Sequence, residues 1–463
     1  MINRNLKNKK IAVLGIGLEG LSSVNFFSKK GALVSVFDRK EKKEIDLNIL
    51  KALKKLKVKF HGGEDYLDKL LDFDLIVRSP GIMLSEEKLK KAKDKGIKIT
   101  SQTKLFFDLS PAKIIGITGT KGKGTTSALI YEMLIKQGLD AYLVGNIGSP
   151  AFEVLDKLSK HSIVVYELSS FQLLDLKKSP HIAAFLMVTS DHLNYHKNIE
   201  EYVNAKRNIL RFQDSKDVAI VNRDYPVSNE SDVFTKGKVF QVSLDQELLN
   251  DGAFVKDEAI WFKKDNKEEK LINIKDICLP GKHNLENICS ASIVAMILGV
   301  SNKNIISILK SFKGLEHRLE LVDTIKGVRY YDDSFSTTPE TAIAAIEAFD
   351  VPEILILGGS SKNSDFSELA KIISEKENIK AIIGIGEEWK RIKDQILALK
   401  PKTFLVEGAE TMGQIIRAAS KIAETEDVVL LSPACASFGT FKNYKERGEQ
   451  FKEEVRKLRM EMN

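Results

Sequence analysis

Apolar positions along the chain follow two patterns, short β-branched runs and longer stretches with helical spacing. A run at residues 10–14 precedes an amphipathic stretch at about 18–30, and a second run follows at 33–37. Strands that alternate with helices in this way are typical of parallel α/β sheets. Further strands are expected at 113–118, 163–166, 182–188, 328–331, 354–357, 381–385, 402–406 and 428–431.

Three strand–turn–helix starts divide the chain into three predicted α/β domains, at residues 1–101, 102–314 and 315–463. A chain of 463 residues is long for one domain, which agrees with this division. We expect Rossmann-like first and third domains. The second is expected to be a P-loop-type ATPase domain with a parallel sheet, on the evidence of the motif described below.

Composition narrows the class of protein. The 71 basic and 64 acidic residues give a net charge of +7, which suits anionic substrates but is too weak to indicate a nucleic-acid surface. Cys278, Cys289 and Cys435 lie far apart and in no metal-ligand spacing, which suggests free thiols in a reducing compartment. Residues 1–10 are polar and basic, unlike a signal peptide, and no apolar run has membrane-spanning length. We therefore expect a soluble, cytoplasmic protein without membrane insertion.

The first glycine motif is Gly-x-Gly-x-x-Gly, from Gly15 to Gly20, between a predicted strand and a predicted helix. Asp38 ends the next strand, where a ribose-binding carboxylate lies in dinucleotide-binding domains. Such a turn lets the backbone approach a diphosphate at a helix N-terminus. It could equally pack the first helix on its sheet, and the glycines do not indicate which nucleotide is bound.

The second glycine motif, from Gly116 to Thr126, is more specific, and it lies between a predicted strand and a helix expected at about 127–137. Its backbone N–H groups would surround phosphate oxygens, Lys123 would reach the β- and γ-phosphates, and a threonine hydroxyl would hold Mg²⁺. Gly116 lies one residue too early for the strict P-loop spacing. Gly124 stands where Ser or Thr usually follows the lysine, which leaves Thr125 as the expected metal ligand.

From this loop onward the chain resembles the Mur ligase family. Motifs follow in the family's order across all three predicted domains, and the C-terminal ones are similar to those of the D-glutamate-adding member. They are Gly145–Gly148, Glu167–Gln172, Asp191-His192, Gly281–Asn287, His317-Arg318, Asp332-Asp333-Ser334, Leu431–Ser437 and Phe441–Gly448.

The resemblance implies a monomeric, ATP- and Mg²⁺-dependent ligase. ATP would phosphorylate the carboxylate of UDP-N-acetylmuramoyl-L-alanine, and the amine of D-glutamate would attack the acyl phosphate. Holding charge on the γ-phosphoryl oxygens is the electrostatic problem of the first step. We expect the site to be complete, and water excluded, only when the domains close.

The resemblance also assigns residues to ATP and metal. Lys123, Glu167, His192, Lys206 and Arg318 would be catalytic, and Thr125, Glu167, His192 and Lys206 would bind magnesium. Read without the resemblance, Glu167 could be a helix cap or an ion-paired residue, and His192 a structural histidine. The expected ATP-binding residues are Gly119, Thr120, Lys121, Gly122, Lys123, Gly124, Thr125, Thr126, Asn284, Asn287, Arg318 and Asp333.

Lys206 lies in a predicted helix at 199–212, on the apolar stripe that includes Tyr202, Val203 and Leu210. Such a lysine usually extends its amine to solvent. A desolvated lysine instead favours the neutral amine, which can react with CO₂. Family members carry a carbamylated lysine at the matching position, so we expect a CO₂-derived carbamate on Lys206.

Substrate residues are likewise assigned by resemblance. Lys362 follows a strand and would pair with a carboxylate, whereas surface lysines in general are common. Phe335 departs from the family, because many relatives have a lysine in that stretch, so a cationic contact is missing or supplied elsewhere. The UDP-precursor residues are Leu18, Glu19, Asp38, Arg39, Gly81, Asn146 and His192, and the D-glutamate residues are Thr337, Lys362, Ser437 and Tyr444.

Three alternative classes remain at this stage. A related amide ligase would join a different amino acid, or glutamate to folate. A nicotinamide-dependent dehydrogenase would use the first glycine motif but leave the second unexplained. A nucleotide switch or nucleic-acid-binding protein is disfavoured by the weak net charge and the paired metal ligands.

Overall fold

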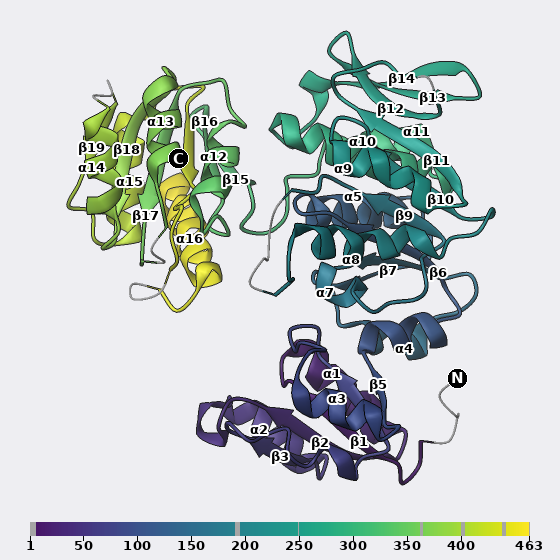
Figure 1. The fold of residues 1–463 in the computed structure, drawn as a ribbon. Helices are drawn as coiled ribbons and strands as arrows, with labels where there is room; N and C mark the ends of the chain where they lie inside the picture. The colour runs from purple at the N-terminus through teal and green to yellow at the C-terminus, as the bar shows by residue number, and fades with distance from the viewer. Residues whose placement is uncertain are drawn as a thin grey trace. The chain divides into compact units, whose positions relative to one another are not determined.

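A computed structural model describes residues 6–189, 195–248, 250–361, 364–399, 403–437 and 441–462. The chain splits into two compact units. The first consists of Met1–Ile274 and Glu286–Ile308, and the second of Lys275–Leu285 and Leu309–Asn463. Two β-sheets lie in the first unit and one in the second, each flanked by helices (Figure 1).

The N-terminal sheet is fully parallel, with strand order β3-β2-β1-β4-β5. Its central strands are apolar at almost every position and are buried on both faces, as a parallel sheet covered by helices requires. Its elements are β1 (Lys10–Leu14), α1 (Leu18–Lys29), β2 (Leu33–Asp38), α2 (Leu47–Lys55), β3 (Lys59–Gly62), β4 (Leu75–Arg78), α3 (Glu87–Asp94) and β5 (Lys98–Thr100).

The second sheet has nine strands in the order β14-β13-β12-β11-β10-β9-β6-β8-β7. Strands β6 to β12 pair in parallel, and β12, β13 and β14 pair antiparallel at one edge. The strands are β6 (Lys113–Thr118), β7 (Ala141–Gly145), β8 (Ile163–Glu167), β9 (Ile182–Phe185), β10 (Val218–Asn222), β11 (Lys238–Ser243), β12 (Gly252–Lys256), β13 (Ala259–Lys264) and β14 (Lys267–Asn273).

Helices cover this sheet, and the interior between them is a continuous apolar core. Because β6 lies between β8 and β9, the loop after β6 is flanked by the carboxyl ends of two buried strands. The α-helices that follow the N-terminal sheet along the chain, up to residue 309, are α4 (Gln102–Leu109), α5 (Lys123–Lys136), α6 (Ala151–Val154), α7 (Ser170–Leu173), α8 (Ile199–Arg211), α9 (Pro226–Asn229), α10 (Lys282–Ile297) and α11 (Asn302–Leu309).

The third sheet has six strands in the order β15-β16-β20-β17-β18-β19 and an apolar core on each face. Only β15 runs antiparallel to its neighbour among the strands described. The elements are β15 (Glu320–Ile325), β16 (Val328–Asp332), α12 (Pro339–Ile346), β17 (Glu353–Gly358), α13 (Ser367–Glu375), β18 (Ile379–Ile385), α14 (Trp389–Ala398), β19 (Phe404–Val406), α15 (Met412–Ile422), β20 (Val428–Leu431) and α16 (Tyr444–Met462).

The predicted fold class is confirmed, with two local corrections. The helix expected at about 127–137 begins earlier, at Lys123, so Thr125 and Thr126 lie in its first turn rather than in a loop. The antiparallel strands β13 and β14 were not predicted. In the part of the chain that the structure describes, no helix has the length and apolar character needed to cross a bilayer.

Candidate functional site

The loop between β6 and α5 passes close to its neighbours. Gly122 has a φ of 83° and forms the N-cap of α5. A Cβ at Gly122 would lie 2.1 Å from Oδ1 of Asn287, so both the backbone conformation and the available space require glycine. Thr126 in the first turn also hydrogen-bonds Asn287, at 3.2 Å. The loop therefore leads directly into the N-terminus of α5, and the unpaired N–H groups at the start of a helix favour anions.

Lys123, the first residue of α5, folds back over this loop. Its Nζ donates hydrogen bonds to the carbonyl oxygens of Gly119 and Thr120, both at 3.0 Å. The amine is only partly buried, and Lys121 in the same loop is exposed. A cation is therefore placed directly above the backbone predicted to surround phosphates.

Oxygen ligands for a metal lie beside the loop. Thr125 and Glu167 are 6% and 5% exposed. Glu167 is the last residue of β8 and pairs in register with Ile117 of β6, two residues before Gly119. A carboxylate and a hydroxyl of this kind are hard oxygen donors, so their chemistry fits the Mg²⁺ that the sequence predicts.

The prediction that Lys206 lies on the buried stripe of its helix is confirmed, because its side chain is 2% exposed. Its Nζ donates a hydrogen bond of 2.7 Å to the carbonyl oxygen of Gly119 and lies 4.6 Å from the ring centroid of Tyr202. The Tyr202 hydroxyl is 2.9 Å from Oγ1 of Thr120. Helix α8 thus contacts the loop between β6 and α5 through a lysine and a tyrosine.

Tyr202 was predicted only as an apolar position, and its contact with Thr120 was missed. Another missed residue is His196, which is buried and lies 2.9 Å from Oγ of Ser170 through its Nε2. Its ring stacks on Phe171, with centroids 5.6 Å apart. His192, predicted as a catalytic and metal-binding residue, lies outside the described residues. The spacing of four between these two histidines was the available signal for His196.

Two of the predicted ATP-binding residues, Asn284 and Asn287, differ in their surroundings. Asn287 belongs to the first compact unit and contacts Thr126 there. Asn284 belongs to the second unit and is buried, and its Nδ2 donates a 2.5 Å hydrogen bond to the carbonyl oxygen of Pro280. That contact is local, because it joins Asn284 to the backbone four residues earlier.

In the N-terminal sheet, the glycine turn is held by Asp38. Its carboxylate accepts hydrogen bonds from the backbone N–H groups of Ile16 and Lys40, both at 2.9 Å. Leu18, at the start of α1, is 81% exposed. Among the other predicted precursor-binding residues, Arg39, Gly81 and Asn146 are exposed as well. The structure thus leaves most of this set open to a ligand and gives Asp38 a role in shaping the turn.

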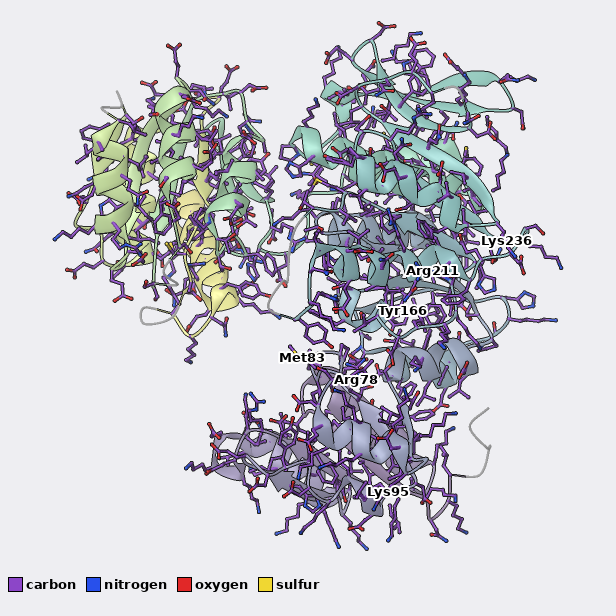
Figure 2. The ribbon with its side chains drawn as sticks, in the orientation of Figure 1. Arg78, Met83, Lys95, Tyr166, Arg211 and Lys236 are labelled. Carbon is purple, nitrogen blue, oxygen red and sulfur yellow. The ribbon has the colours of Figure 1, made fainter. Side chains whose placement is uncertain are left out.

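Arg78, at the end of β4, is 1% exposed and was not predicted (Figure 2). Its Nη1 donates hydrogen bonds to the carbonyl oxygens of Pro80 and Ile82, at 3.0 and 2.5 Å, around Gly81. It also reaches residues of the second sheet's connections, the hydroxyl of Tyr195 at 3.3 Å and the carboxylate of Asp175 at 3.4 Å. Arg78 therefore ties the loop that contains Gly81 to the segment just after residue 194.

Glu19 lies near this arginine, and its Oε1 is shielded from solvent without a hydrogen-bond partner among the described residues. Burial raises the pKa of Glu19 to about 7 from 4.5, against the lowering effect of Arg78. Because the folded protein then holds the proton more tightly than the unfolded chain, this carboxyl's contribution to stability decreases as pH rises from about 4.5 to about 7.

We expect Glu19→Gln to remove this loss. The Tm of Glu19→Gln minus the Tm of the parent protein should increase as pH rises from 4.5 to about 7 and should then stay constant. Glu64→Gln, at an exposed position of the same domain, is the control. A Tm difference independent of pH for Glu19→Gln would mean that the carboxyl is not desolvated.

In the second unit, Asp333 and Arg318 lie at the carboxyl edge of the third sheet. Asp333 is 2% exposed and accepts hydrogen bonds from the N–H of Leu319 at 3.1 Å and the hydroxyl of Ser432 at 2.7 Å. Burial raises the pKa of Asp333 to about 7. One oxygen of Asp333 therefore holds the residue after Arg318, and the other holds Ser432 just after β20, roles that were not predicted.

The residues predicted to bind D-glutamate lie in or next to loops at the same edge of the third sheet. Ser437 is buried just after β20, Thr337 precedes α12, and Tyr444 opens α16. The N–H of Ser360 donates to the carbonyl oxygen of Ala436, which brings the loop after β17 beside the loop after β20. Lys362 lies outside the described residues.

Arg447 joins these loops from α16 and was missed by the sequence analysis. It is 0% exposed, and Ser334 accepts two of its hydrogen bonds, through Oγ and the carbonyl oxygen, both at 2.9 Å. It also donates to the carbonyl oxygens of Cys435 and Ala436, at 3.3 and 3.4 Å. Burial lowers the pKa of Arg447 to about 10, so the group remains a cation at neutral pH.

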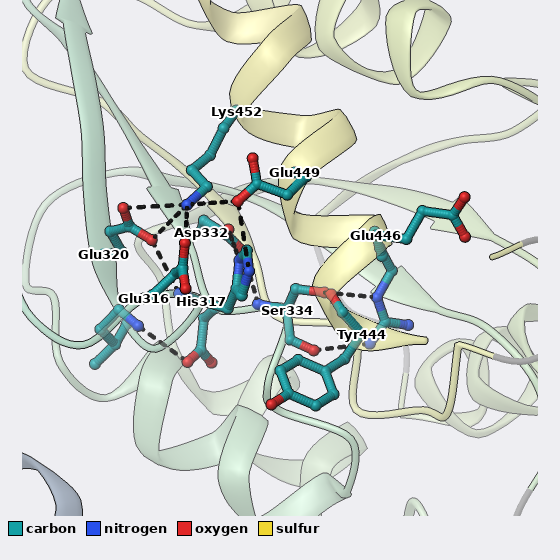
Figure 3. A network of polar contacts seen from close by, with 12 residues as sticks. Glu316, His317, Glu320, Asp332, Ser334, Tyr444, Glu446, Glu449 and Lys452 are labelled. Atoms are coloured by element: carbon teal, nitrogen blue, oxygen red, sulfur yellow. Dashed lines mark hydrogen bonds and ion pairs between the residues drawn. The ribbon is translucent and has the colours of Figure 1, made fainter. Parts of the chain in front are cut away.

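A second polar network lies nearby on α16 (Figure 3). Nζ of Lys452 is 3.0 Å from Glu449 and 3.3 Å from both Glu316 and Glu320. His317 contacts Asp332 at 2.7 Å. Lys452 supplies the positive charge among these carboxylates, so the network holds the segment before Arg318 against α16.

We expect Arg447→Met to destabilise the second unit, because four buried acceptor groups would lose a charged donor. A loss of about 2 kcal/mol or more is typical for such a set of hydrogen bonds. Calorimetry should show a lower Tm for this unit. Arg456→Met, at an exposed position of the same helix, should leave the Tm unchanged. An equal Tm for the parent and Arg447→Met would contradict the proposed importance of these bonds.

Comparison with known protein families matches three consecutive parts of the chain. Residues 9–101 match the N-terminal domain of MurD-like Mur ligases, 117–295 the Mur ligase middle domain, and 317–435 the glutamate ligase domain of Mur ligases. This chain belongs to the Mur ligase family. The loop between β6 and α5 therefore lies in the Mur ligase middle domain, and Ser437 just beyond the matched part of the glutamate ligase domain.

Relatives within the Mur ligase family match over nearly the whole chain. The UDP-N-acetylmuramoylalanine–D-glutamate ligase of Acetivibrio thermocellus is 37% identical over 460 residues, which is 98% of each protein. The ligase of the same name from Caldanaerobacter subterraneus is 39% identical over 459 residues, covering 98% of this chain and 99% of that protein.

Solved structures of Mur ligases share the fold at low sequence identity. UDP-N-acetylmuramate–alanine ligase MurC of Thermotoga maritima aligns with a TM-score of 0.57 and 18% identity, over 97% of this chain and all of that one. MurF of the same organism, solved with ADP, also gives a TM-score of 0.57, at 16% identity over 99% and 98% of the chains. These likenesses support the fold and its three sheets.

Proposed function

We propose that this chain is an ATP-dependent ligase that joins D-glutamate to UDP-N-acetylmuramoyl-L-alanine and releases ADP and phosphate. The observation that carries the proposal is the 37% identity, over 98% of both proteins, to a relative named for this reaction. The loop at the carboxyl end of β6 supplies a physical basis for the ATP half of the reaction.

The phosphates of ATP would lie against the N-terminal turn of α5. Lys123 exchanges its two carbonyl contacts for phosphate oxygens, and its charge offsets the charge on the γ-phosphoryl group. Thr125 and Glu167 would hold magnesium, which neutralises phosphate charge when bound. Lys121 and the backbone of residues 119–126 complete the proposed phosphate contacts.

The chemistry needs no covalent bond to the protein. An oxygen of the precursor's carboxylate attacks the γ-phosphorus, ADP leaves, and an acyl phosphate forms. The uncharged amine of D-glutamate then attacks the carbonyl carbon, phosphate leaves with the former carboxylate oxygen, and the amine loses a proton. The protein's contribution is to hold two anions close together and to keep water from the acyl phosphate.

A carbamate on Lys206 is part of the proposal. The neutral amine adds to CO₂ and loses one proton, which gives an anionic oxygen ligand. The carbamate retains an N–H, so the hydrogen bond to the carbonyl oxygen of Gly119 is compatible with it. Burial of the side chain supports the reaction because desolvation disfavours the ammonium form. The carbamate oxygen and His192 are proposed to bind a second Mg²⁺, separate from the one assigned to Thr125 and Glu167.

The remaining substrates are assigned to loops at the carboxyl ends of strands, where ligands bind in open α/β sheets. Leu18, Glu19, Asp38, Arg39, Gly81 and Asn146 would bind the UDP precursor, with His192. Thr337, Lys362, Ser437 and Tyr444 would bind D-glutamate. Arg318, Asp333, Asn284 and Asn287 are assigned to ATP, and the contact of Asn284 with Pro280 makes it the weakest member.

Phosphate release tests the proposal. Purified protein with ATP, Mg²⁺ and UDP-N-acetylmuramoyl-L-alanine should release phosphate when D-glutamate is added. L-glutamate or L-lysine should give little release. Release with L-lysine alone would indicate a different amide ligase of the family, and no release with any of the three would reject the function.

A further inference from the structure

Phe335 lies in the stretch where, by the family resemblance, many relatives have a lysine. Its ring lies under the guanidinium of Arg318, with 4.3 Å between Cζ and the ring centroid. This distance is within the range of a cation–π interaction. The Phe335 side chain is 40% exposed and Arg318 is partly buried, so the pair lies at the surface of the second unit rather than in its core.

The ring is held in place by two further contacts. The rings of Phe335 and Tyr444 meet edge to face, with centroids 5.1 Å apart and planes at 88°. The backbone N–H of Phe335 donates to the carbonyl oxygen of His317, the residue before Arg318, at 2.9 Å. Oγ of Ser334 donates to the carbonyl oxygen of Tyr444 at 2.8 Å, so the two aromatic residues belong to segments that are hydrogen-bonded to each other (Figure 3).

We propose that Phe335 is a positioning residue that holds the Arg318 guanidinium ready to bind phosphate, with Tyr444 as the support of its ring. The inference rests on the proposed function, in which Arg318 is assigned to ATP. The two ends of the arginine are thereby fixed by one short segment, its backbone through His317 and its guanidinium through the ring.

An aromatic ring suits this task for a physical reason. A planar guanidinium can stack on a ring face and still direct its N–H groups outward to phosphate oxygens. A lysine at residue 335 would instead repel Arg318. Phe335 therefore supplies no cation of its own but places the guanidinium of Arg318 for contact with phosphate.

Kinetics of Phe335 variants test the proposal. We expect Phe335→Leu, which keeps an apolar side chain but no ring, to lower kcat/KM for ATP by about 3- to 10-fold. Phe335→Tyr should lose less than Phe335→Leu, and Phe335→Lys should lose at least as much. Phe404→Leu, at an exposed phenylalanine of β19, is the matched control and should leave the kinetics unchanged.

A double-mutant cycle separates positioning from packing. In an Arg318→Ala background, Phe335→Leu should cause no further loss, because the group that the ring positions is gone. ATP affinity, measured by calorimetry on the same proteins, should follow the same pattern without depending on turnover. Equal losses from Phe335→Leu in both backgrounds, or a gain of activity in Phe335→Lys, would overturn the inference.

The parent protein in the same assay distinguishes this failure from failure of the proposed function. If the parent is active and Phe335→Leu and Phe335→Tyr have the same kcat/KM for ATP, only the role of Phe335 is contradicted. A parent that binds no ATP and releases no phosphate contradicts the proposed function, and the inference with it.

Discussion

Replacing Lys123 by alanine is expected to lower kcat for ADP release by at least about 10²-fold, the effect of losing one preorganised electrostatic contact. Nζ of Lys123 already lies 3.0 Å from two carbonyl oxygens of the phosphate loop, so little rearrangement separates it from bound phosphates. Turnover at saturating ATP and D-glutamate is the measurement. Because the loss is in the transition state, it should persist at saturation.

Two controls accompany this experiment. Lys136→Ala removes an exposed lysine from the last turn of the same helix and should leave kcat unchanged. Unchanged Tm values for both variants would show that the fold is intact. Near-parent turnover by Lys123→Ala would reject the role of this lysine, whatever the effect on the affinity for ATP.

The second large effect is expected for Lys206. Lys206→Ala should lose activity to a similar degree, about 10²-fold, because the buried carbamate oxygens would be absent. Added bicarbonate should restore little activity, since alanine has no amine to react. Short-chain carboxylic acids, such as acetate, should restore part of it by placing a carboxylate in the space left by the side chain.

Lys206→Arg is the matched variant for this test. Arginine can still donate a hydrogen bond to the carbonyl oxygen of Gly119 but forms no carbamate, so it should be as inactive as alanine. Native mass spectrometry of the parent should show the added mass of one CO₂, absent from both variants. An active Lys206→Arg protein would contradict the carbamate and leave the lysine a structural role.

The sequence predicted most of what depends on local pattern. The buried parallel strands follow from runs of β-branched residues, and burial of Lys206 follows from helical spacing. Glu167 was expected at the end of a strand and is the last residue of β8. These features need only the periodicity of one element, which is why they could be predicted.

Features that depend on contacts between distant segments were missed. Tyr202 contacts Thr120 across 82 residues, and Arg447 contacts Ser334 across 113. Helix α5 begins four residues before the predicted start because Gly122, fitted against Asn287, caps it. Propensity alone places two glycines and two threonines in a loop, whereas the tertiary contact places Thr125 and Thr126 in a helix.

The contact between Phe335 and Arg318 also could not be predicted from the sequence. The sequence shows that an expected lysine is absent, but not what replaces it. Only the spatial arrangement reveals the ring under Arg318, because the two residues are joined by the fold rather than by a motif. For the same reason, the sequence predicted Asp333 as an ATP-binding residue but not the hydrogen bonds that its carboxylate accepts from Leu319 and Ser432.

The most direct measurement follows the carboxylate oxygen. UDP-N-acetylmuramoyl-L-alanine labelled with ¹⁸O in its carboxylate, incubated with ATP, Mg²⁺ and D-glutamate, should yield inorganic phosphate that carries one ¹⁸O atom. The label reaches phosphate only if ATP phosphorylates that carboxylate and a nucleophile then attacks its carbonyl carbon, and dependence on D-glutamate identifies the amine as that nucleophile. Unlabelled phosphate, or label in a nucleotide product, would contradict an acyl-phosphate ligase.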